Sequence, residues 1–297
     1  MQNPERNLKI IETFKVPNLG KKTRLQDLAH GMFQHIPTKS GVKKALKNKL
    51  VKINGISVHS GTFLLGGELI ELYQSNAKKN KPKIDIQLEV IFEDDYLALI
   101  NKPAGITVSG NKNWTLENAL SSHLKKSTQP DTLLNPEPIH RLDHATSGIL
   151  LIGKTASLVI KLNKLFENRN IQKIYFAVSI GKMPPKGQIE TPIDEKVSST
   201  KYKVLATEVS EKFDFLNLVA LYPKTGRKHQ IRRHLSSIGH PILGDSIYCE
   251  KDKLLKGNGL YLHAVSLEFI HPITKENLLF KATITKKFQR LFPSFRF

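Results

Sequence analysis

The sequence after residue 85 is a series of short strand-like runs, and this pattern constrains the fold more than any other feature. The runs are rich in β-branched and aromatic residues and are bounded by turn-forming residues. In order they are IQLEVIFEDDYLALINKP, QKIYFAVSIGK, TKYKVLATEV, FDFLNLVALYP, GLYLHAVSLEFIHP and NLLFKATI. Helices are favoured by TLENALSSHLKK, TASLVIKLNKLFENRN and RKHQIRRHLSSIG. Strands in series with occasional helices predict an α+β domain with a mixed, largely antiparallel sheet and flanking helices.

The first 80 residues predict a smaller and more basic α/β unit. Residues 24–36, RLQDLAHGMFQHI, favour an amphipathic helix, because their apolar residues recur on one helical face. Ser40 is the expected N-cap of a second, short helix. The surface of that helix is crowded with lysines, among them Lys43, Lys44 and Lys47. A cluster of lysines on one short helix predicts contact with RNA or DNA, although one or two such lysines would suit any solvated helix face.

A hairpin and a linker complete this amino-terminal unit. Asn54 and Gly55 in LVKINGISVHSG predict the two-residue turn of a β-hairpin, and GTFLLGGELIELY predicts a closing pair of strands. Residues 74–84, QSNAKKNKPKI, are polar, charged and interrupted by a proline, which is typical of a linker. We therefore predict one domain over residues 1–80, a linker to about residue 84, and a second domain over residues 85–297.

The net charge predicts a polyanionic partner. The chain holds 46 Lys and Arg against 26 Asp and Glu, a formal charge of +20, which favours RNA or DNA over an anionic membrane surface. No run approaches the roughly 20 apolar residues that span a bilayer. The single cysteine, Cys249, excludes an intramolecular disulfide and does not favour an oxidising compartment. We expect a soluble, cytoplasmic monomer.

The stretch HRLDHATSG, residues 140–148, carries the chemistry, and the two histidines first suggest a metal site. The spacing of His140 and His144 matches the two ligands on the helix of a zinc hydrolase, in which a glutamate follows the first histidine. Here Arg141 holds that position, and the segment continues as a strand rather than as a helix. We therefore expect no metal.

Asp143 is the more informative residue of this stretch. It is followed by Thr146, Ser147 and Gly148, small residues that would let a large substrate approach the backbone. From this pattern alone a surface ion pair with Arg141 is the alternative. A second alternative, a thiolate nucleophile at Cys249, is disfavoured because no neighbouring histidine or second cysteine would lower its pKa.

Five collinear motifs give the chain a resemblance to the RluA-type family of pseudouridine synthases. HRLDHATSG resembles the catalytic motif of that family, and it is accompanied in the family's order by INKPAGITV, QKIYFAVSIG, TGRKHQIRRHLSSIGHPILGDSIY and LYLHAVSLEFIHP. The amino-terminal unit is similar to the S4 RNA-binding module, in which two small helices and a hairpin present basic residues to structured RNA. The resemblance implies an isomerase that needs neither a metal nor an organic cofactor.

The resemblance also implies roles for individual residues. Asp143 would be the carboxylate that permits the base of a uridine to be detached, rotated and rejoined through C5, by a chemical path that stays open. Tyr175 would stack on the uracil and take part in the proton transfer from C5. Arg232, or its neighbour Arg233, would pair with Asp143 and keep it ionised. Arg141 would fill the space of the flipped nucleotide or hold its backbone.

The remaining implied residues contact RNA or form the pocket. The RNA contacts are His140, Arg141, Arg227, Lys228 and His229, with the lysines of the amino-terminal helix, and the pocket residues are Leu142, Thr146, Ser147, Gly148 and Ile231. The implied substrate is structured RNA, with ribosomal RNA favoured over transfer RNA. The alternative is a protein that has kept the fold and binds RNA, for example in ribosome assembly, without catalysis.

Overall fold

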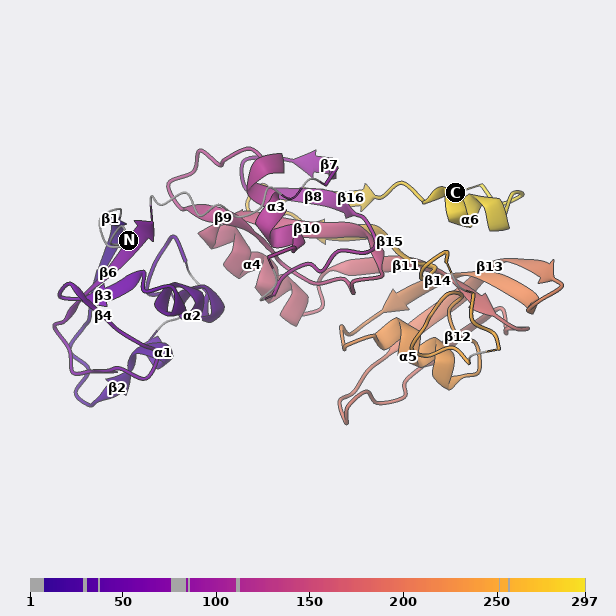
Figure 1. The fold of residues 1–297 in the computed structure, drawn as a ribbon, viewed down its shortest axis with the longest axis horizontal. Coiled ribbons are helices and arrows are strands. Elements are labelled where there is room, and N and C mark those ends of the chain that lie inside the picture. Colours follow the sequence, from indigo (N-terminus) through magenta and orange to yellow (C-terminus); the bar gives the residue numbers. More distant parts are fainter. Residues whose placement is uncertain are drawn as a thin grey trace.

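The computed structural model describes residues 8–28, 31–36, 38–75, 84, 86–110, 113–250, 252–255 and 257–296. Within them the chain forms a small amino-terminal sheet with two short helices and a large sheet with four helices (Figure 1). In the described ranges, no helix combines the length and the apolar character that a membrane span requires.

The large sheet has ten strands and is mixed but largely antiparallel, as predicted. Its main path runs in the order β12-β13-β14-β11-β15-β10-β8-β7, while β16 pairs with β15 and β9 pairs with β10. The strands are β7 (Glu89–Glu93), β8 (Leu97–Lys102), β9 (Thr132–Pro138), β10 (Ser147–Thr155), β11 (Gln172–Ile180), β12 (Lys186–Ile189), β13 (Thr200–Ser210), β14 (Asp214–Pro223), β15 (Leu262–Ile270) and β16 (Asn277–Lys281). Strands β9, β10 and β12 had no counterpart among the six predicted runs, although β10 agrees with the expectation that the stretch after Asp143 continues as a strand.

The pairing of β10 with β15 is parallel, whereas the other pairings of these strands are antiparallel. It depends on Gly148, which lies opposite Ala264 and has a φ of +114°. A Cβ at Gly148 would collide with the backbone of Ala264. The glycine therefore serves the close approach of two strands, and not the approach of substrate that the sequence suggested.

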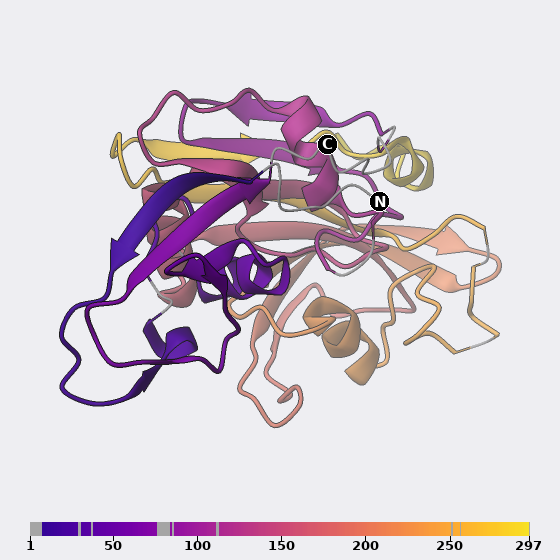
Figure 2. The ribbon, with the colours of Figure 1, turned by 60° about the vertical axis from the view of Figure 1, so that its left-hand side comes forward.

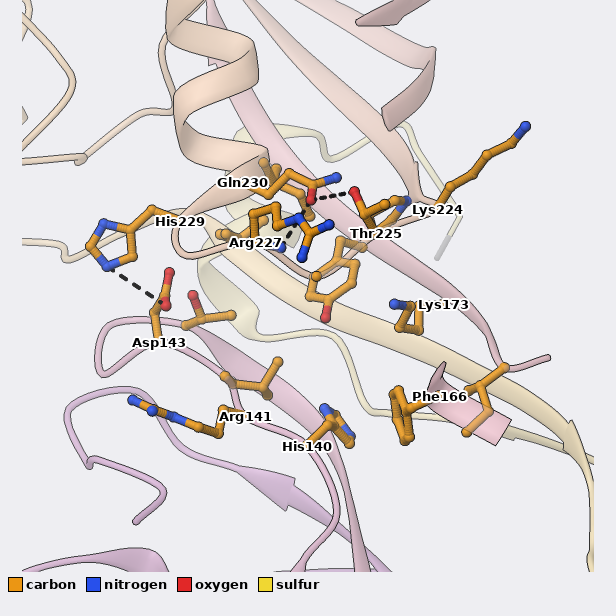
Figure 3. Close-up of a pocket in the computed structure, with 18 of the residues that line it drawn as sticks. His140, Arg141, Asp143, Phe166, Lys173, Lys224, Thr225, Arg227, His229 and Gln230 are labelled. Carbon is orange, nitrogen blue, oxygen red and sulfur yellow. Dashed lines mark hydrogen bonds and ion pairs between the residues drawn. The ribbon is translucent and has the colours of Figure 1, made fainter. Parts of the chain in front are cut away.

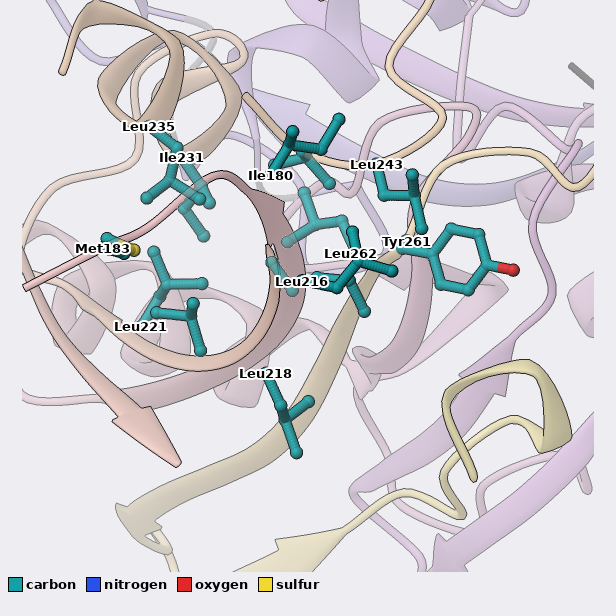
Figure 4. Packing of buried hydrophobic residues seen from close by; sticks show 14 of the residues in the cluster. Ile180, Met183, Leu216, Leu218, Leu221, Ile231, Leu235, Leu243, Tyr261 and Leu262 are labelled. Atoms are coloured by element: carbon teal, nitrogen blue, oxygen red, sulfur yellow. The ribbon is translucent and has the colours of Figure 1, made fainter. Parts of the chain in front are cut away.

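Three of the four helices of the large domain lie where the sequence predicted them. These are α3 (Leu116–His123), α4 (Ala156–Glu167) and α5 (Gln230–Ser237). The fourth, α6 (Lys286–Leu291), was not predicted. Helix α5 inserts Ile231 and Leu235 into a cluster with residues of β11 and β14, such as Leu221 (Figure 4). This apolar anchorage fixes the amino-terminal end of α5 against the sheet.

The amino-terminal sheet has the order β1-β6-β3-β4, and β2 pairs with β5. Its elements are β1 (Leu8–Lys15), β2 (Thr23–Arg24), α1 (Leu25–Leu28), α2 (Lys39–Lys47), β3 (Val51–Ile53), β4 (Ile56–Ser57), β5 (Phe63–Leu64) and β6 (Leu69–Ser75). The hairpin turn is confirmed, because Asn54 and Gly55 both have positive φ values, 49° and 80°. Strand β1 was not predicted.

Three predictions for this unit were wrong in detail. Helix α1 ends at Leu28, and residues 31–36 are turns and bends, although Met32 and Phe33 still enter the core. Thr38 caps α2 by accepting a hydrogen bond from the N–H of Gly41 at 3.1 Å, so Ser40 lies inside the helix. Strand β5 pairs with β2, and strand β6 pairs with β1 and β3, so β5 and β6 do not pair with each other.

The amino-terminal unit has a hydrophobic core of its own, built from residues between Val16 and Leu72. Most of the predicted linker, residues 76–83, lies outside the described residues. Helix α2 faces the large domain (Figure 2), and the ammonium of Lys44 is 2.7 Å from a carboxylate oxygen of Glu117 on α3. Lys44 is therefore engaged within the protein, whereas Lys43 and Lys47 are exposed.

Candidate active site

A cavity of about 630 Å³ lies between the amino-terminal end of α5, the loop that enters β10, strand β11 and the carboxyl end of α4 (Figure 3). The chain thus brings together residues from four separate motifs. Its lining residues include Ile139, His140, Arg141, Leu142, Asp143, Thr146, Phe166, Lys173, Tyr175, Arg227, His229, Gln230, Ile231 and Arg232. Cations outnumber carboxylates in this lining, since Asp143 and Glu167 are its acidic members, and the cavity therefore favours an anionic ligand.

Asp143 projects into the cavity from the turn that precedes β10. Its side chain is 29% exposed, and one carboxylate oxygen lies 3.7 Å from Nε2 of His229 and the other 3.7 Å from Nη1 of Arg232. Within the described part of the chain, no hydrogen bond reaches this carboxylate. The carboxylate thus faces an imidazole and a guanidinium without a hydrogen bond from either, and its oxygens stay accessible to a substrate.

Arg232 is held by a second carboxylate that the sequence reasoning missed. Its Nε and Nη2 each donate a hydrogen bond of 2.7 Å to Asp245, which also accepts the N–H groups of Ile247 at 3.0 Å and Tyr248 at 3.2 Å. Burial raises the pKa of Asp245, but these hydrogen bonds outweigh it, and the pKa lies below its usual value. The pair is buried and bidentate, so the guanidinium is fixed while it faces Asp143.

His229 faces Asp143 from the turn before α5, with a left-handed φ of 54°. Its Nδ1 is 3.0 Å from the hydroxyl of Tyr248. Burial, helped by Arg232 and Lys228, lowers the pKa of His229 more than Asp143 raises it. When the Tyr248 hydroxyl donates to Nδ1, the neutral ring directs its Nε2–H toward Asp143.

Tyr175 lies on β11 and lines the cavity. Leu142, Thr146 and Ile231 line it too, from other elements. Burial, and then the negative charge of Asp143, raise the pKa of the Tyr175 phenol. The phenol is therefore neutral at physiological pH. It can stack on a base and donate a hydrogen bond, but it does not supply a phenolate base.

Lys102 was also missed, although it lies in the INKPAGITV motif. Its side chain is fully buried, and its ammonium donates to the carbonyl oxygens of Pro103 at 2.9 Å, Thr146 at 2.7 Å and His144 at 3.4 Å. Burial lowers its pKa to about 8, against the opposing effect of the charge on Asp143. Lys102 thus connects the end of β8 by hydrogen bonds to the turn that contains Asp143.

Gln230 fixes the basic loop in front of α5. Its amide oxygen accepts the hydroxyl of Thr225 at 2.7 Å and the N–H of Arg227 at 3.0 Å, while its amide nitrogen donates to Ser199 and Thr200 on the β13 side. No charge or spacing signal in the sequence marks such a residue, because its role is to satisfy backbone groups of one loop.

Some of the other predicted residues line the cavity and others do not. Arg141 and Arg227 line it. The ring of His140 lines it as well, but its Nε2 accepts the N–H of Leu151, so this nitrogen is not free for a metal. Ser147 and Gly148 lie behind the wall, with the Ser147 hydroxyl bonded to His263.

Two further residues lie away from the cavity. Lys228 is exposed outside the lining. Cys249 also lies outside it, and burial raises the pKa of its thiol. This argues against the alternative of a thiolate nucleophile.

A basic cavity with an accessible carboxylate suits an enzyme that acts on an anionic substrate, and comparisons with known proteins give its class. A family model described as RNA pseudouridylate synthase matches residues 96–237. The ribosomal large subunit pseudouridine synthase D of Vibrio parahaemolyticus is 32% identical over 93% of this chain and 91% of its own length. The tRNA pseudouridine synthase C of the same organism is 32% identical over 71% of this chain and 96% of its own length.

The fold has a solved counterpart in human RNA pseudouridylate synthase domain containing 4. Its TM-score is 0.56 at 24% identity, over 69% of this chain and 92% of that one. The chain belongs to the RNA pseudouridine synthase family, and it is an RNA pseudouridine synthase with the α+β fold of that family.

Proposed function

We propose that this protein isomerises a specific uridine in structured ribosomal RNA, with Asp143 as the catalytic carboxylate. The observation that carries the proposal is the state of Asp143: it is the acidic side chain in the wall between Tyr175 and Arg232, compensated by two groups at 3.7 Å. A residue that served only structure would be expected to use its carboxylate in hydrogen bonds.

The proposed reaction conserves all atoms of uridine. The bond between C1′ and N1 breaks, a bond between C1′ and C5 forms, C5 loses a proton, and N1 gains one. Asp143 assists this exchange, and Arg232 places a positive charge 3.7 Å from its carboxylate. Water accepts the C5 proton and supplies the proton to N1, while Tyr175 stacks on the uracil through the turn of the base. Tyr175 takes part in this transfer as a neutral phenol that donates a hydrogen bond.

Base flipping is part of the proposal, because an enzyme that acts on a base cannot reach its target atoms inside a duplex. Extrusion of the uridine costs a few kcal/mol of stacking and pairing. We assign compensation for this cost to Arg141, which is exposed at the rim and takes the vacated space or the phosphate there. Arg227, Lys228, His229 and His140 provide further contacts to the RNA.

We further propose that the chain divides into an S4-like RNA-binding domain over residues 1–80 and a catalytic domain over residues 85–297. Separate hydrophobic cores support this division. The exposed lysines Lys43 and Lys47 on α2 would extend the contact to structured RNA, with Lys44 directed partly to Glu117. The protein would act as a cytoplasmic monomer with RNA as its partner and no membrane.

Ribosomal RNA is favoured by the extent of the matches. The relative named for the large ribosomal subunit matches 93% of this chain. The relative named for transfer RNA matches 71%, which is about the share that residues 85–297 make up. The greater coverage supports an amino-terminal unit shared by this chain and the relative named for the large ribosomal subunit. A shared RNA-binding unit in turn favours ribosomal RNA as the substrate.

The test is to incubate the protein with transcripts of large-subunit ribosomal RNA and of transfer RNA and to map pseudouridine at single-nucleotide resolution. We expect product in a ribosomal transcript. Asp143→Asn should bind the same RNA and form no product, and binding by both proteins should weaken steeply as salt rises. Product from Asp143→Asn at the wild-type rate would refute the role of Asp143. RNA binding without product from the wild-type protein would support the assembly factor.

A further inference from the structure

The cavity extends well beyond Asp143, and its far end has its own chemistry. Its volume of about 630 Å³ is in the range that holds a whole drug-sized ligand, roughly 300–1,000 Å³. The uracil ring beside Tyr175 and Asp143 would use only part of it. The remainder includes His140, Phe166 and Lys173 (Figure 3), and their chain neighbours Ile139, Glu167, Arg169 and Ile171 also line the cavity.

Lys173 is the central feature of this far end. It lies two residues before Tyr175 on β11, and both side chains line the cavity, as the alternation of a strand requires. At a rise of about 3.3 Å per residue, their Cα atoms are about 7 Å apart. A ligand group that contacts Lys173 is therefore the immediate neighbour of one that contacts Tyr175.

The charge of Lys173 has no counter-ion among the described residues. Its ammonium lies 5.8 Å from the centroid of the Phe166 ring, and in the described ranges it forms no ion pair or hydrogen bond. Burial alone lowers its pKa. A half-buried cation without a partner is costly, and an anionic ligand removes that cost.

The side chains around Lys173 favour an anionic ligand as its partner. His140 stacks on Phe166 with ring centroids 5.0 Å apart, and burial with the charge of Lys173 lowers the pKa of His140 to about 3, so the ring is neutral. Arg169, in a left-handed turn just after α4, adds a second cation to the same end. Aromatic walls and two cations suit a phosphodiester.

We propose that Lys173, with Arg169, binds a phosphodiester of the RNA that flanks the flipped uridine. This subsite rests on the proposed function, since the uridine is what positions the phosphate. Phe166 and His140 form the apolar wall that holds the Lys173 stem and excludes water. The contact locks the extruded nucleotide by its backbone, so that Tyr175 and Asp143 act on a base in one position.

The experiment is a scan of the substrate with single methylphosphonates, which remove the charge of one linkage at a time. With wild-type protein, one linkage next to the target uridine should lower kcat/KM about tenfold, the size expected of a charge-assisted hydrogen bond. Lys173→Met should lower kcat/KM about tenfold on unmodified RNA and should lose no more when that linkage is neutral. Lys173→Arg should retain most of the activity.

Controls separate this inference from a structural role and from the proposed function. Lys161→Met, on the exposed face of α4, should leave kcat/KM unchanged, and thermal unfolding should show that Lys173→Met is folded. If every methylphosphonate affects Lys173→Met as it affects the wild type, the subsite is refuted. If the wild type makes no pseudouridine from unmodified RNA, the proposed function itself fails.

Discussion

The buried pair of Arg232 and Asp245 gives the sharpest test of how the site is built. Asp245→Asn keeps the shape of the side chain but removes its charge and one of its two acceptors. If the amide oxygen keeps the bonds from Ile247, Tyr248 and Nη2 of Arg232, the new NH₂ group faces Nε of Arg232, donor against donor. Removing one partner of a buried pair costs about 3–5 kcal/mol, and we expect this loss in the free energy of unfolding.

The loss should depend on pH in a defined direction. Because the folded state lowers the pKa of Asp245, its contribution to stability is present above the pKa of an unfolded aspartate, about 3.9, and is lost as pH falls through the folded pKa. Urea unfolding of wild type and Asp245→Asn should therefore differ most near pH 7 and converge at acid pH. Turnover should fall too, since Arg232 is no longer fixed opposite Asp143, whereas KM for RNA should change little because Asp245 does not line the cavity.

The neighbouring pair supplies the control. Arg233 binds Asp194 at 2.9 Å, but the Asp194 side chain is 66% exposed. Asp194→Asn should leave the unfolding midpoint and turnover close to the wild-type values, because water and salt screen an exposed pair. Equal effects of the two substitutions, or a change below about 1 kcal/mol for Asp245→Asn, would refute the reasoning.

Three further predictions concern the frame around the site. Lys102→Met removes the ammonium that donates to the carbonyl oxygens of Pro103 and Thr146, so the free energy of unfolding should fall by about 2–4 kcal/mol and turnover should fall with it, as urea unfolding and initial rates would measure. Tyr175→Phe should keep the shape of the wild-type pH–rate profile from pH 7 to pH 10, because the raised pKa of Tyr175 leaves no phenolate to titrate there; a limb present only in the wild type would contradict this. Gly148→Ala should destabilise the fold by about 2–4 kcal/mol through its clash with Ala264, whereas Gly226→Ala, which meets no atom within 4 Å, should not.

The strands of the large domain could be predicted because each carries its signal locally. The run FDFLNLVALYP alternates weakly but is rich in apolar residues, and it became β14, buried in the middle of the sheet. The run RLQDLAHGMFQHI gave a wrong prediction of a long helix, because its local signal does not decide its structure. Its apolar spacing is helical, yet Met32 and Phe33 reach the core from bends, since tertiary packing overrides a short periodic signal.

The catalytic candidates could be predicted from motifs, but their supports could not. Asp143, Arg232, Asp245 and Lys102 all stand in recognisable stretches, but nothing in those stretches shows which groups Asp245 and Lys102 bind. Asp245 and Lys102 act through groups 13 and 44 residues away, and such pairs follow from the topology of the sheet. Ser147 and Gly148 look like substrate contacts in the sequence because small residues favour both ligand approach and strand packing, and only the register of β10 with β15 distinguishes the two.

The arrangement of the two carboxylates explains how Asp143 can lie beside a guanidinium and still be available to a substrate. An arginine paired directly with the catalytic carboxylate would occupy its oxygens and would have to be displaced by substrate. Here Asp245 takes two of the hydrogen bonds of Arg232 at 2.7 Å, and Asp143 is left at 3.7 Å. The guanidinium therefore faces Asp143 without a hydrogen bond, and the lone pairs of Asp143 remain open to a substrate. The fixed Asp245–Arg232 pair thus places a cation beside Asp143 without blocking its oxygens.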